Sequence, residues 1–422
     1  MKKLDYPRLT PLWIAVFVDI LGFSIILPFL PFIMAEFNSS PLVIGLLLSS
    51  NAVFGIFFGP LLGKLSDKYG RKPLLLISQA GTIAGFIILA FSTNIYMLFI
   101  ARIVDGIFGG QFPISKAVIG DIIPPQERGK QMTNIGTTFT LAFLIGPALG
   151  GFLSPFGIFG PGIVASALAI FTMAFTAIFL KESLPLKINS EKRKNQQIEH
   201  PVLTNIDTLN DSSSSIWRNH RVLILLLQYS FIALAAGIFQ TSFSIFGALK
   251  LDLDALTVGL LLSSMGAFQV VFRAFFFNPI RKKLGDPRTA MLGLGSYLLA
   301  YLLLGFVSEL WQLAIVLFYI SFCGATSRGI TIGFTSRSVD SRNQGKIMGL
   351  TSMLDNLAQI LGPIIGGFLL TLPINILFGG VLSGLSIIPF ILSFYVLKFG
   401  YETRTKNQLS RKIPEIPEII IE

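Results

Sequence analysis

Six charged residues lie deep within the long apolar segments of this 422-residue chain. At the centre of a membrane helix each would cost about 2.5–3.5 kcal/mol, so none is expected to face lipid. A buried carboxylate resists ionisation and a nearby arginine favours it, so a balanced carboxylate can take up and release a proton. The six residues are Asp19, Arg102, Asp105, Arg273, Arg328 and Asp355.

Spacing and depth predict two pairings among these charges. Arg102 and Asp105 are three residues apart, so they share one face of a helix. Asp355 and Arg328 lie at similar depths in their segments and are candidates for an ion pair. Each pair could serve in proton transfer, or it could hold helices in register, and both alternatives stay open. Gln111 is a further candidate for a polar cavity, whereas Arg273 is expected to reach phosphate headgroups.

Composition places these charges in a membrane protein. The chain is 52% hydrophobic and 13% charged, whereas soluble proteins carry about 25% charge. Its mean hydropathy is +0.72. Apolar runs recur along almost the whole chain, and each is long enough to cross about 30 Å of hydrocarbon.

The sequence lacks the cysteines and motifs that disulfide-linked, metal-binding or ATP-driven proteins need. A single cysteine, Cys323, forms no intramolecular disulfide and no multi-cysteine metal site. Neither a phosphate-binding loop motif nor an H-E-x-x-H motif occurs, which argues against ATP-driven and zinc chemistry. We therefore expect no catalytic residues, no cofactor and no metal, and the protein is not predicted to be an enzyme.

Turn and charge clusters divide the apolar runs into twelve predicted helices. The first six are 11–35, 41–62, 73–93, 96–118, 132–154 and 159–180. The second six are 221–248, 256–279, 289–308, 311–335, 347–371 and 375–398.

These helices predict an all-α membrane protein with two six-helix bundles around a central cavity. The bundles comprise residues 1–180 and 221–398. Residues 181–220 between them are polar and contain a run of four serines, which is typical of a flexible linker. The polar residues 399–422 are predicted to form a largely disordered tail.

Basic residues predict the orientation. The formal net charge is +11, and nearly all Lys and Arg residues fall in the termini, the linker and the loops on one side. The loops on the other side contain a single basic residue, Lys250. The positive-inside rule therefore puts both termini and the linker in the cytoplasm. This scatter over short loops argues against nucleic-acid binding.

One motif occurs twice, about half the chain apart, which indicates an internal duplication. In a membrane chain a repeat points to two packed halves with a binding site between them. The motif either bends its helices to seal one side of the cavity or simply allows tight packing. Its two copies are Gly146, Pro147, Gly150 and Gly151, and Gly362, Pro363, Gly366 and Gly367.

The segment after the second predicted helix, residues 63–72, reads GKLSDKYGRK. Gly63 and Gly70 are expected to permit a tight turn. The Asp67 carboxylate is expected to accept hydrogen bonds at a nearby helix N-terminus, with Arg71 as a further partner. Such a contact could act as a conformational latch that forms and breaks between two states.

This segment resembles the signature loop of the major facilitator superfamily. Further similarity lies in Asp19-x-x-Gly22, in Arg102-x-x-x-Gly106-x-x-x-Gly110 and in the repeated glycine–proline motif. Together they resemble the twelve-helix drug/proton antiporter branch, which includes tetracycline exporters. The resemblance implies that Asp19 is the proton-binding acid and that Arg102 relays protons. Ala142 and Thr133 replace glycines of the extended antiporter motif, which weakens the assignment to that branch.

The leading hypothesis is a secondary active transporter in the plasma membrane that exports a small amphipathic compound or drug in exchange for protons. The alternative is a proton symporter or uniporter that imports a small metabolite such as a sugar or organic acid. A receptor or scaffold that has lost transport, or a membrane-embedded enzyme, fits less well. The expected partners are the substrate, protons and the lipid bilayer, and the protein is expected to be a monomer.

Overall fold

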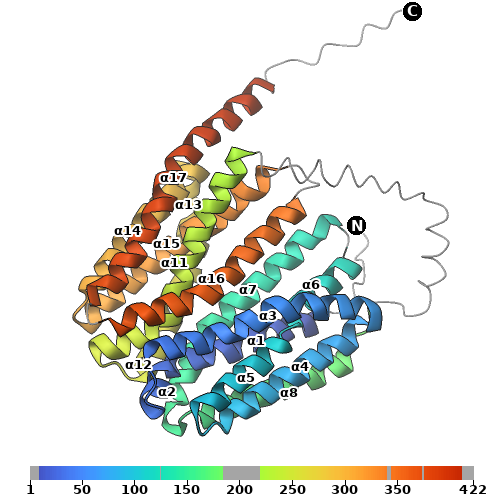
Figure 1. The fold of residues 1–422 in the computed structure, drawn as a ribbon. Helices are drawn as coiled ribbons and strands as arrows, with labels where there is room; N and C mark the ends of the chain where they lie inside the picture. The colour runs from blue at the N-terminus through green and yellow to red at the C-terminus, as the bar shows by residue number, and fades with distance from the viewer. Residues whose placement is uncertain (1–8, 124, 184–218, 340–343, 373–374, 411–422) are drawn as a thin grey trace, which may run out of the picture.

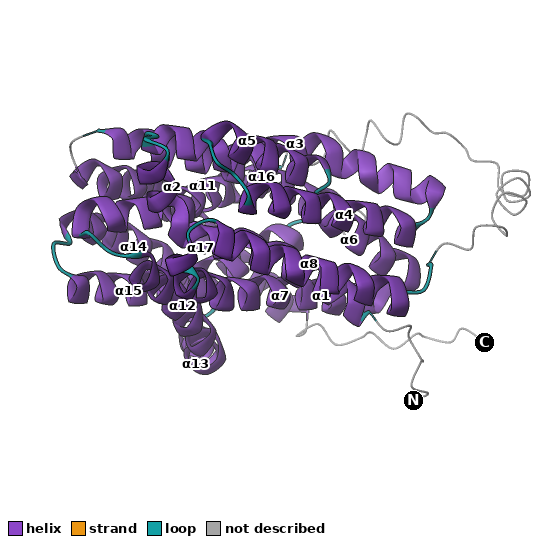
Figure 2. Ribbon diagram, turned by 90° about the horizontal axis from the view of Figure 1, so that it is seen from below, coloured by secondary structure: helices purple, strands orange, loops and turns teal. Residues whose placement is uncertain are grey.

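The computed structural model describes residues 9–123, 125–183, 219–339, 344–372 and 375–410 (Figure 1). All regular elements within these residues are helices (Figure 2). Eleven of the twelve predicted spans contain helices that are long and apolar enough to cross a membrane. The remaining span, 132–154, contains the shorter apolar helix Thr137–Phe152. The chain is therefore an all-helical membrane protein, as predicted. Most of the predicted linker, residues 184–218, and residues 411–422 of the predicted tail lie outside the described residues.

The first half contains the spans predicted from the sequence, with two of them divided. The helices are α1(Thr10–Ile26), η1(Leu27–Phe29), α2(Leu30–Glu36), α3(Pro41–Tyr69), α4(Arg71–Ala90), α5(Ile95–Ile107), α6(Gln111–Ile122), α7(Pro125–Phe152), η2(Ser154–Phe156) and α8(Phe159–Phe179). The second half comprises α11(His220–Leu251), α12(Ala255–Val271), the π-helical turn η3(Phe272–Phe276), α13(Phe277–Leu284), α14(Asp286–Phe306), α15(Leu310–Arg337), α16(Gln344–Thr371) and α17(Asn375–Ser410).

Local sequence explains where the helices depart from the prediction. Pro28 and Pro31 lack a backbone N–H, and the chain changes to a 3₁₀ turn between α1 and α2. The fourth span breaks after Ile107, and the break contains the consecutive glycines Gly109 and Gly110. Hydropathy marks the end of a span but not the end of a helix. The prediction therefore ended the last span at residue 398, whereas α17 continues to Ser410 and the first part of the predicted tail is helical.

The helices pack in two groups that follow the halves of the chain. In the first half α1 contacts α7 and α8, and α4 contacts α5 and α8. In the second half α11 contacts α16 and α17, and α14 contacts α15 and α17. The groups meet mainly through two helix pairs, α3 with α16 and α7 with α12. Figure 1 shows them together at the end where α2 and α12 lie, and diverging toward the opposite end. We call these the closed end and the open end.

Both copies of the repeated motif lie at the closed end and make equivalent contacts. A Cβ atom on Gly150 would collide with the Ile25 carbonyl of α1, and one on Gly366 would collide with the Ser242 hydroxyl of α11. The last glycine of each copy faces the other half. A Cβ on Gly151 would lie 2.8 Å from the Leu256 Cα of α12, and one on Gly367 would collide with the Pro41 carbonyl of α3.

Two glycines on the partner helices complete this contact. A Cβ on Gly45 would collide with the Pro363 carbonyl, and a Cβ on Gly259 would collide with the Pro147 carbonyl. The Ser49 hydroxyl also donates a hydrogen bond to the Ile360 carbonyl at 2.6 Å. Small residues let the helix backbones touch, which is how membrane helices associate closely. The motif therefore packs the two halves against each other, and its role in bending the helices stays a prediction.

The closed end should open when a methyl group is placed in this contact. Gly45→Ala puts a Cβ against backbone that cannot move aside, and overpacking of this kind costs about 1–3 kcal/mol. Pulsed electron paramagnetic resonance between spin labels at Ser39→Cys and Thr371→Cys should show a longer and broader distance distribution than in the parent. The buried native cysteine, Cys323, is replaced by serine in all samples.

Gly384→Ala is the matched control, because a Cβ there meets no atom within 4 Å. An unchanged distance distribution in Gly45→Ala would show that the glycine contact does not hold the halves together.

Candidate functional site: buried charges and the Arg71 cluster

Three charges in the first half form one cluster. Asp105 and Arg102, both on α5, are 8% and 2% exposed. The Arg102 Nη1 lies 3.5 Å from the Asp105 carboxylate, so the predicted proximity of these two residues is confirmed. Asp19 on α1 interacts electrostatically with both of them. The cluster thus holds two carboxylates and one guanidinium inside the first bundle.

Neutral side chains connect the two carboxylates. The Gln111 amide, 3% exposed at the start of α6, donates to Asp19 at 3.1 Å and to the Thr82 hydroxyl at 3.1 Å. Thr82 in turn hydrogen-bonds Asp105. On the far side of Asp105, the Asn51 amide donates to its carboxylate at 2.9 Å. A continuous polar path therefore links Asp19 to Asp105 through Gln111 and Thr82.

Arg102 has no hydrogen-bond acceptor for its guanidinium among the described residues. It is held by the 3.5 Å ion pair and by the Phe86 ring, whose centroid is 5.7 Å away. A buried cation with so few partners is held mainly by nearby negative charge. One proton on Asp19 or Asp105 makes this cluster neutral, and its loss makes the cluster negative.

The second half contains the other predicted pair. The Arg328 Nη2 of α15 donates to the Asp355 carboxylate of α16 at 2.7 Å, which confirms this pairing. The Tyr229 hydroxyl of α11 lies 2.8 Å from both carboxylate oxygens. The side chains of Arg328 and Asp355 are 46% and 30% exposed. Arg273 also lies exposed, on η3, where its predicted contact with headgroups stays a prediction.

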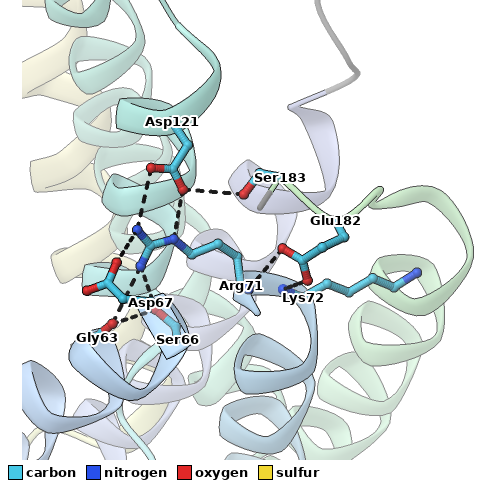
Figure 3. Close-up of polar contacts among 8 residues, drawn as sticks. All are labelled: Gly63, Ser66, Asp67, Arg71, Lys72, Asp121, Glu182 and Ser183. Atoms are coloured by element: carbon cyan, nitrogen blue, oxygen red, sulfur yellow. Dashed lines mark hydrogen bonds and ion pairs between the residues drawn. The ribbon is translucent and has the colours of Figure 1, made fainter. Parts of the chain in front are cut away.

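Residues 63–72 form a charged cluster at the open end, drawn in Figure 3. The Arg71 guanidinium lies 2.5 Å from Asp67 and 2.8 Å from Asp121, the latter on α6. It also donates to the Ser66 hydroxyl at 2.7 Å. We call Arg71 together with Ser66, Asp67 and Asp121 the Arg71 cluster. It ties α3, α4 and α6 together at their ends.

Two details of the sequence prediction are corrected here. Residues 63–69 are not a loop, because α3 continues to Tyr69 and only Gly70, with φ of 104°, makes the turn. Asp67 does not cap α4. The Glu182 carboxylate instead accepts the Arg71 and Lys72 backbone N–H groups, both at 3.0 Å (Figure 3). An acidic group at a helix N-terminus satisfies free donors and suits the helix dipole.

Sequence reasoning missed several residues that complete these sites. Asn51, Thr82 and Tyr229 are polar residues inside apolar segments, which marks them as candidates for a buried site. Many other polar residues of these segments share that feature, so it did not single them out. Asp121 and Glu182 stand beside turns, where charge is ordinary. The missed residues are Asn51, Ser66, Thr82, Asp121, Glu182 and Tyr229.

A membrane chain with two packed helical halves, joined at one end and with charges inside each half, has the architecture of a secondary transporter. A family model described as Major Facilitator Superfamily matches residues 12–276 and 225–421, so the chain belongs to that family. This is a family of transporters rather than enzymes.

Known proteins of this kind are similar over most of their length. The class H tetracycline resistance protein of Pasteurella multocida is 29% identical over 359 residues, covering 83% of this chain and 86% of that protein. The class B tetracycline resistance protein of Escherichia coli is 30% identical over 351 residues, covering 82% and 84%. The crystal structure of a D-xylose–proton symporter aligns with a TM-score of 0.72 at 14% identity, covering 94% and 98%.

The Arg71 cluster provides a test of the latch hypothesis. Asp67 is 57% exposed, so its ion pair contributes at most about 1 kcal/mol to stability. Asp67→Asn should therefore insert and fold like the parent, yet lower the initial rate of transport up to about fivefold, which corresponds to about 1 kcal/mol. Initial rates in proteoliposomes, normalised to the amount of inserted protein, measure the effect.

Asp286→Asn is the control, because Asp286 pairs with Arg281 at the corresponding turn of the second half. Equal losses in the two variants would mean that the effect is a general one of turn charge. A parental rate in Asp67→Asn would contradict the latch.

Proposed function

We propose that this transporter exports a small amphipathic compound in exchange for protons, by alternating access. The observation that carries the proposal is the buried cluster of Asp19, Arg102 and Asp105 in the first half. Two carboxylates beside one arginine give a group whose charge changes by one when a proton binds. The names of the tetracycline resistance relatives support export of a drug-like compound.

The geometry suits coupling because the cluster is enclosed on the side of the closed end. Contacts between the halves are concentrated there, at the Ser49–Ile360 hydrogen bond and at the glycines around it. Protons would reach Asp19 from one side in this state and from the other side after the halves rearrange. Proton binding would then shift the balance between the states, since it removes the cost of a buried negative charge.

Orientation is part of the same proposal. The open end carries both ends of the described chain as well as the Arg71 cluster (Figure 1). Basic loops belong on the cytoplasmic side, so the structure would represent the inward-facing state. The bacterial relatives support a location in the cytoplasmic membrane. We also propose that residues 1–180 and 221–398 form the two bundles and that residues 181–220 form a cytoplasmic linker between them.

The experiment measures pH-gradient-driven uptake of tetracycline and of the cationic dye rhodamine 123 into proteoliposomes. Asp19→Asn removes the titratable group, so uphill uptake should fall at least about tenfold, while downhill exchange continues. Asp19→Glu keeps the carboxylate and should retain part of the uphill flux. Arg102→Gln removes the charge that favours proton release, and it should also abolish uphill flux.

Asp254→Asn serves as the matched control, because Asp254 caps α12 outside the cluster and asparagine caps equally well. If Asp19→Asn accumulates either probe as well as the parent, Asp19 is not the coupling acid. If the parent shows no gradient-driven flux of any tested compound, the proposed function itself is wrong.

A further inference from the structure

Three phenylalanines of the first half have no part in the sites described above. The rings of Phe139 and Phe143, both on α7, are stacked with their centroids 4.9 Å apart. Phe143 in turn contacts Phe23 of α1, with ring centroids 6.3 Å apart. Within the part of the chain that the structure describes, Phe139 stacks on no ring besides Phe143, and it is 38% exposed. One face of the Phe139 ring is therefore open to another planar group.

The exposed ring of Phe139 points away from the lipid-facing side of α7. Leu141, Ile145 and Phe152 are the other large apolar residues exposed on this part of the helix. They follow Phe139 by two, six and thirteen residues, which is about 200–240° around a helix of 3.6 residues per turn. These three residues form the stripe that lipid covers. Phe143 follows Phe139 by four residues and shares its face.

The helices that pack against α7 show where the face of Phe139 and Phe143 is directed. On one side of this face α1 meets α7 at Gly146 and Gly150, and on the other side α12 meets it at Pro147 and Gly151. The two rings project between these contacts, opposite the lipid stripe. Because α12 belongs to the second half, this face looks into the region where the halves meet.

Phe139 also lies on the open side of the contact between the halves. A Cβ on Gly266 of α12 would lie 3.3 Å from the Leu144 Cα. Phe139 precedes Leu144 by five residues, which is about 7.5 Å along a helix. Since α7 runs from the open end toward the closed end (Figure 1), Phe139 stands beyond this contact, toward the side where the halves diverge.

The internal repeat supports this orientation. Phe139 precedes Gly146 by seven residues, and Asp355 precedes Gly362 by seven residues, so the two occupy equivalent positions on the motif helices α7 and α16. The Asp355 side chain is 30% exposed, and a charge within a span is too costly to face lipid. The equivalent position therefore faces the interior in the second half, as Phe139 does in the first.

The register of α1 against α7 brings these rings near the proton cluster. Both helices run from the open end toward the closed end, and Phe23 meets Phe143. One helical turn back on each helix are Asp19 and Phe139, on the faces of Phe23 and Phe143. A molecule that lies on Phe139 is thus at about the level of Asp19.

We propose that Phe139 and Phe143 form a subsite that stacks on a planar aromatic part of the transported compound, so that the substrate is an amphipathic molecule with a fused aromatic ring system. Phe23 supports Phe143 from α1. Offset stacking favours an aromatic partner over an aliphatic one. This proposal rests on the proposed function, since it assigns the substrate class of the same transporter.

The test compares an aromatic and an aliphatic cation of equal charge, rhodamine 123 and tetrapentylammonium. Fluorescence anisotropy with purified protein in neutral detergent gives the dissociation constant of rhodamine 123, and displacement of the dye gives that of tetrapentylammonium. The parent should bind rhodamine 123 more tightly. Phe139→Leu removes the ring but keeps an apolar side chain. It should weaken rhodamine 123 binding about fivefold, which corresponds to about 1 kcal/mol, and leave tetrapentylammonium binding unchanged.

Phe152→Leu is the matched control, because Phe152 is 62% exposed on the lipid stripe of the same helix. It should leave both dissociation constants unchanged. Phe139→Tyr keeps an aromatic ring and should bind rhodamine 123 like the parent. Thermal unfolding of each variant in detergent shows that it remains folded. If Phe139→Leu does not fold, Phe139→Met against Phe152→Met gives the same decision.

Rhodamine 123 binding that Phe139→Leu leaves unchanged would overturn the proposal, as would an equal loss in Phe152→Leu. A parent that binds rhodamine 123 no more tightly than tetrapentylammonium would also overturn it, and so would equal weakening of both cations in Phe139→Leu. Binding in detergent needs no proton gradient. The aromatic subsite can therefore fail while coupled transport stands, and coupled transport can fail while the subsite stands.

Discussion

The architecture depends on direct backbone contact between the two halves at the closed end. Gly45 meets the Pro363 carbonyl and Gly259 meets the Pro147 carbonyl, so each half supplies one glycine and one proline to a symmetric contact. Lipid and apolar side chains are equally hydrophobic, so membrane helices gain association energy from close packing. Since the contact is confined to one end, the other end can separate without unfolding either bundle.

The same symmetry does not extend to the charges. The first half buries Arg102 and Asp105 almost completely, whereas the second half leaves Arg328 and Asp355 partly exposed. A buried pair is governed by the cost of desolvation, and an exposed pair remains available to a ligand. Duplicated bundles thus carry two kinds of site. The two halves therefore hold their charge pairs in different environments, one removed from solvent and one partly open to it.

The sequence predicted those features that depend on spacing along one helix or on depth in the membrane. Arg102 and Asp105 are near each other because they are three residues apart, and Arg328 reaches Asp355 because their depths match. It could not predict contacts that depend on how helices pack. Asp121 meets Arg71 from 50 residues away, and Glu182 reaches the start of α4 from 111 residues away.

The break between α5 and α6 connects these observations. A continuous helix would fix the direction of Gln111 relative to Arg102 by 3.6-residue periodicity. The interruption at Phe108–Gly110 separates the two parts of the span, and the Ser78 hydroxyl holds it by hydrogen-bonding the Phe108 carbonyl and the Gly110 N–H. Gln111 then reaches Asp19 from the start of α6. A movement of α6 would therefore be felt at two places at once, because Gln111 at its start contacts Asp19 and Asp121 near its end contacts Arg71.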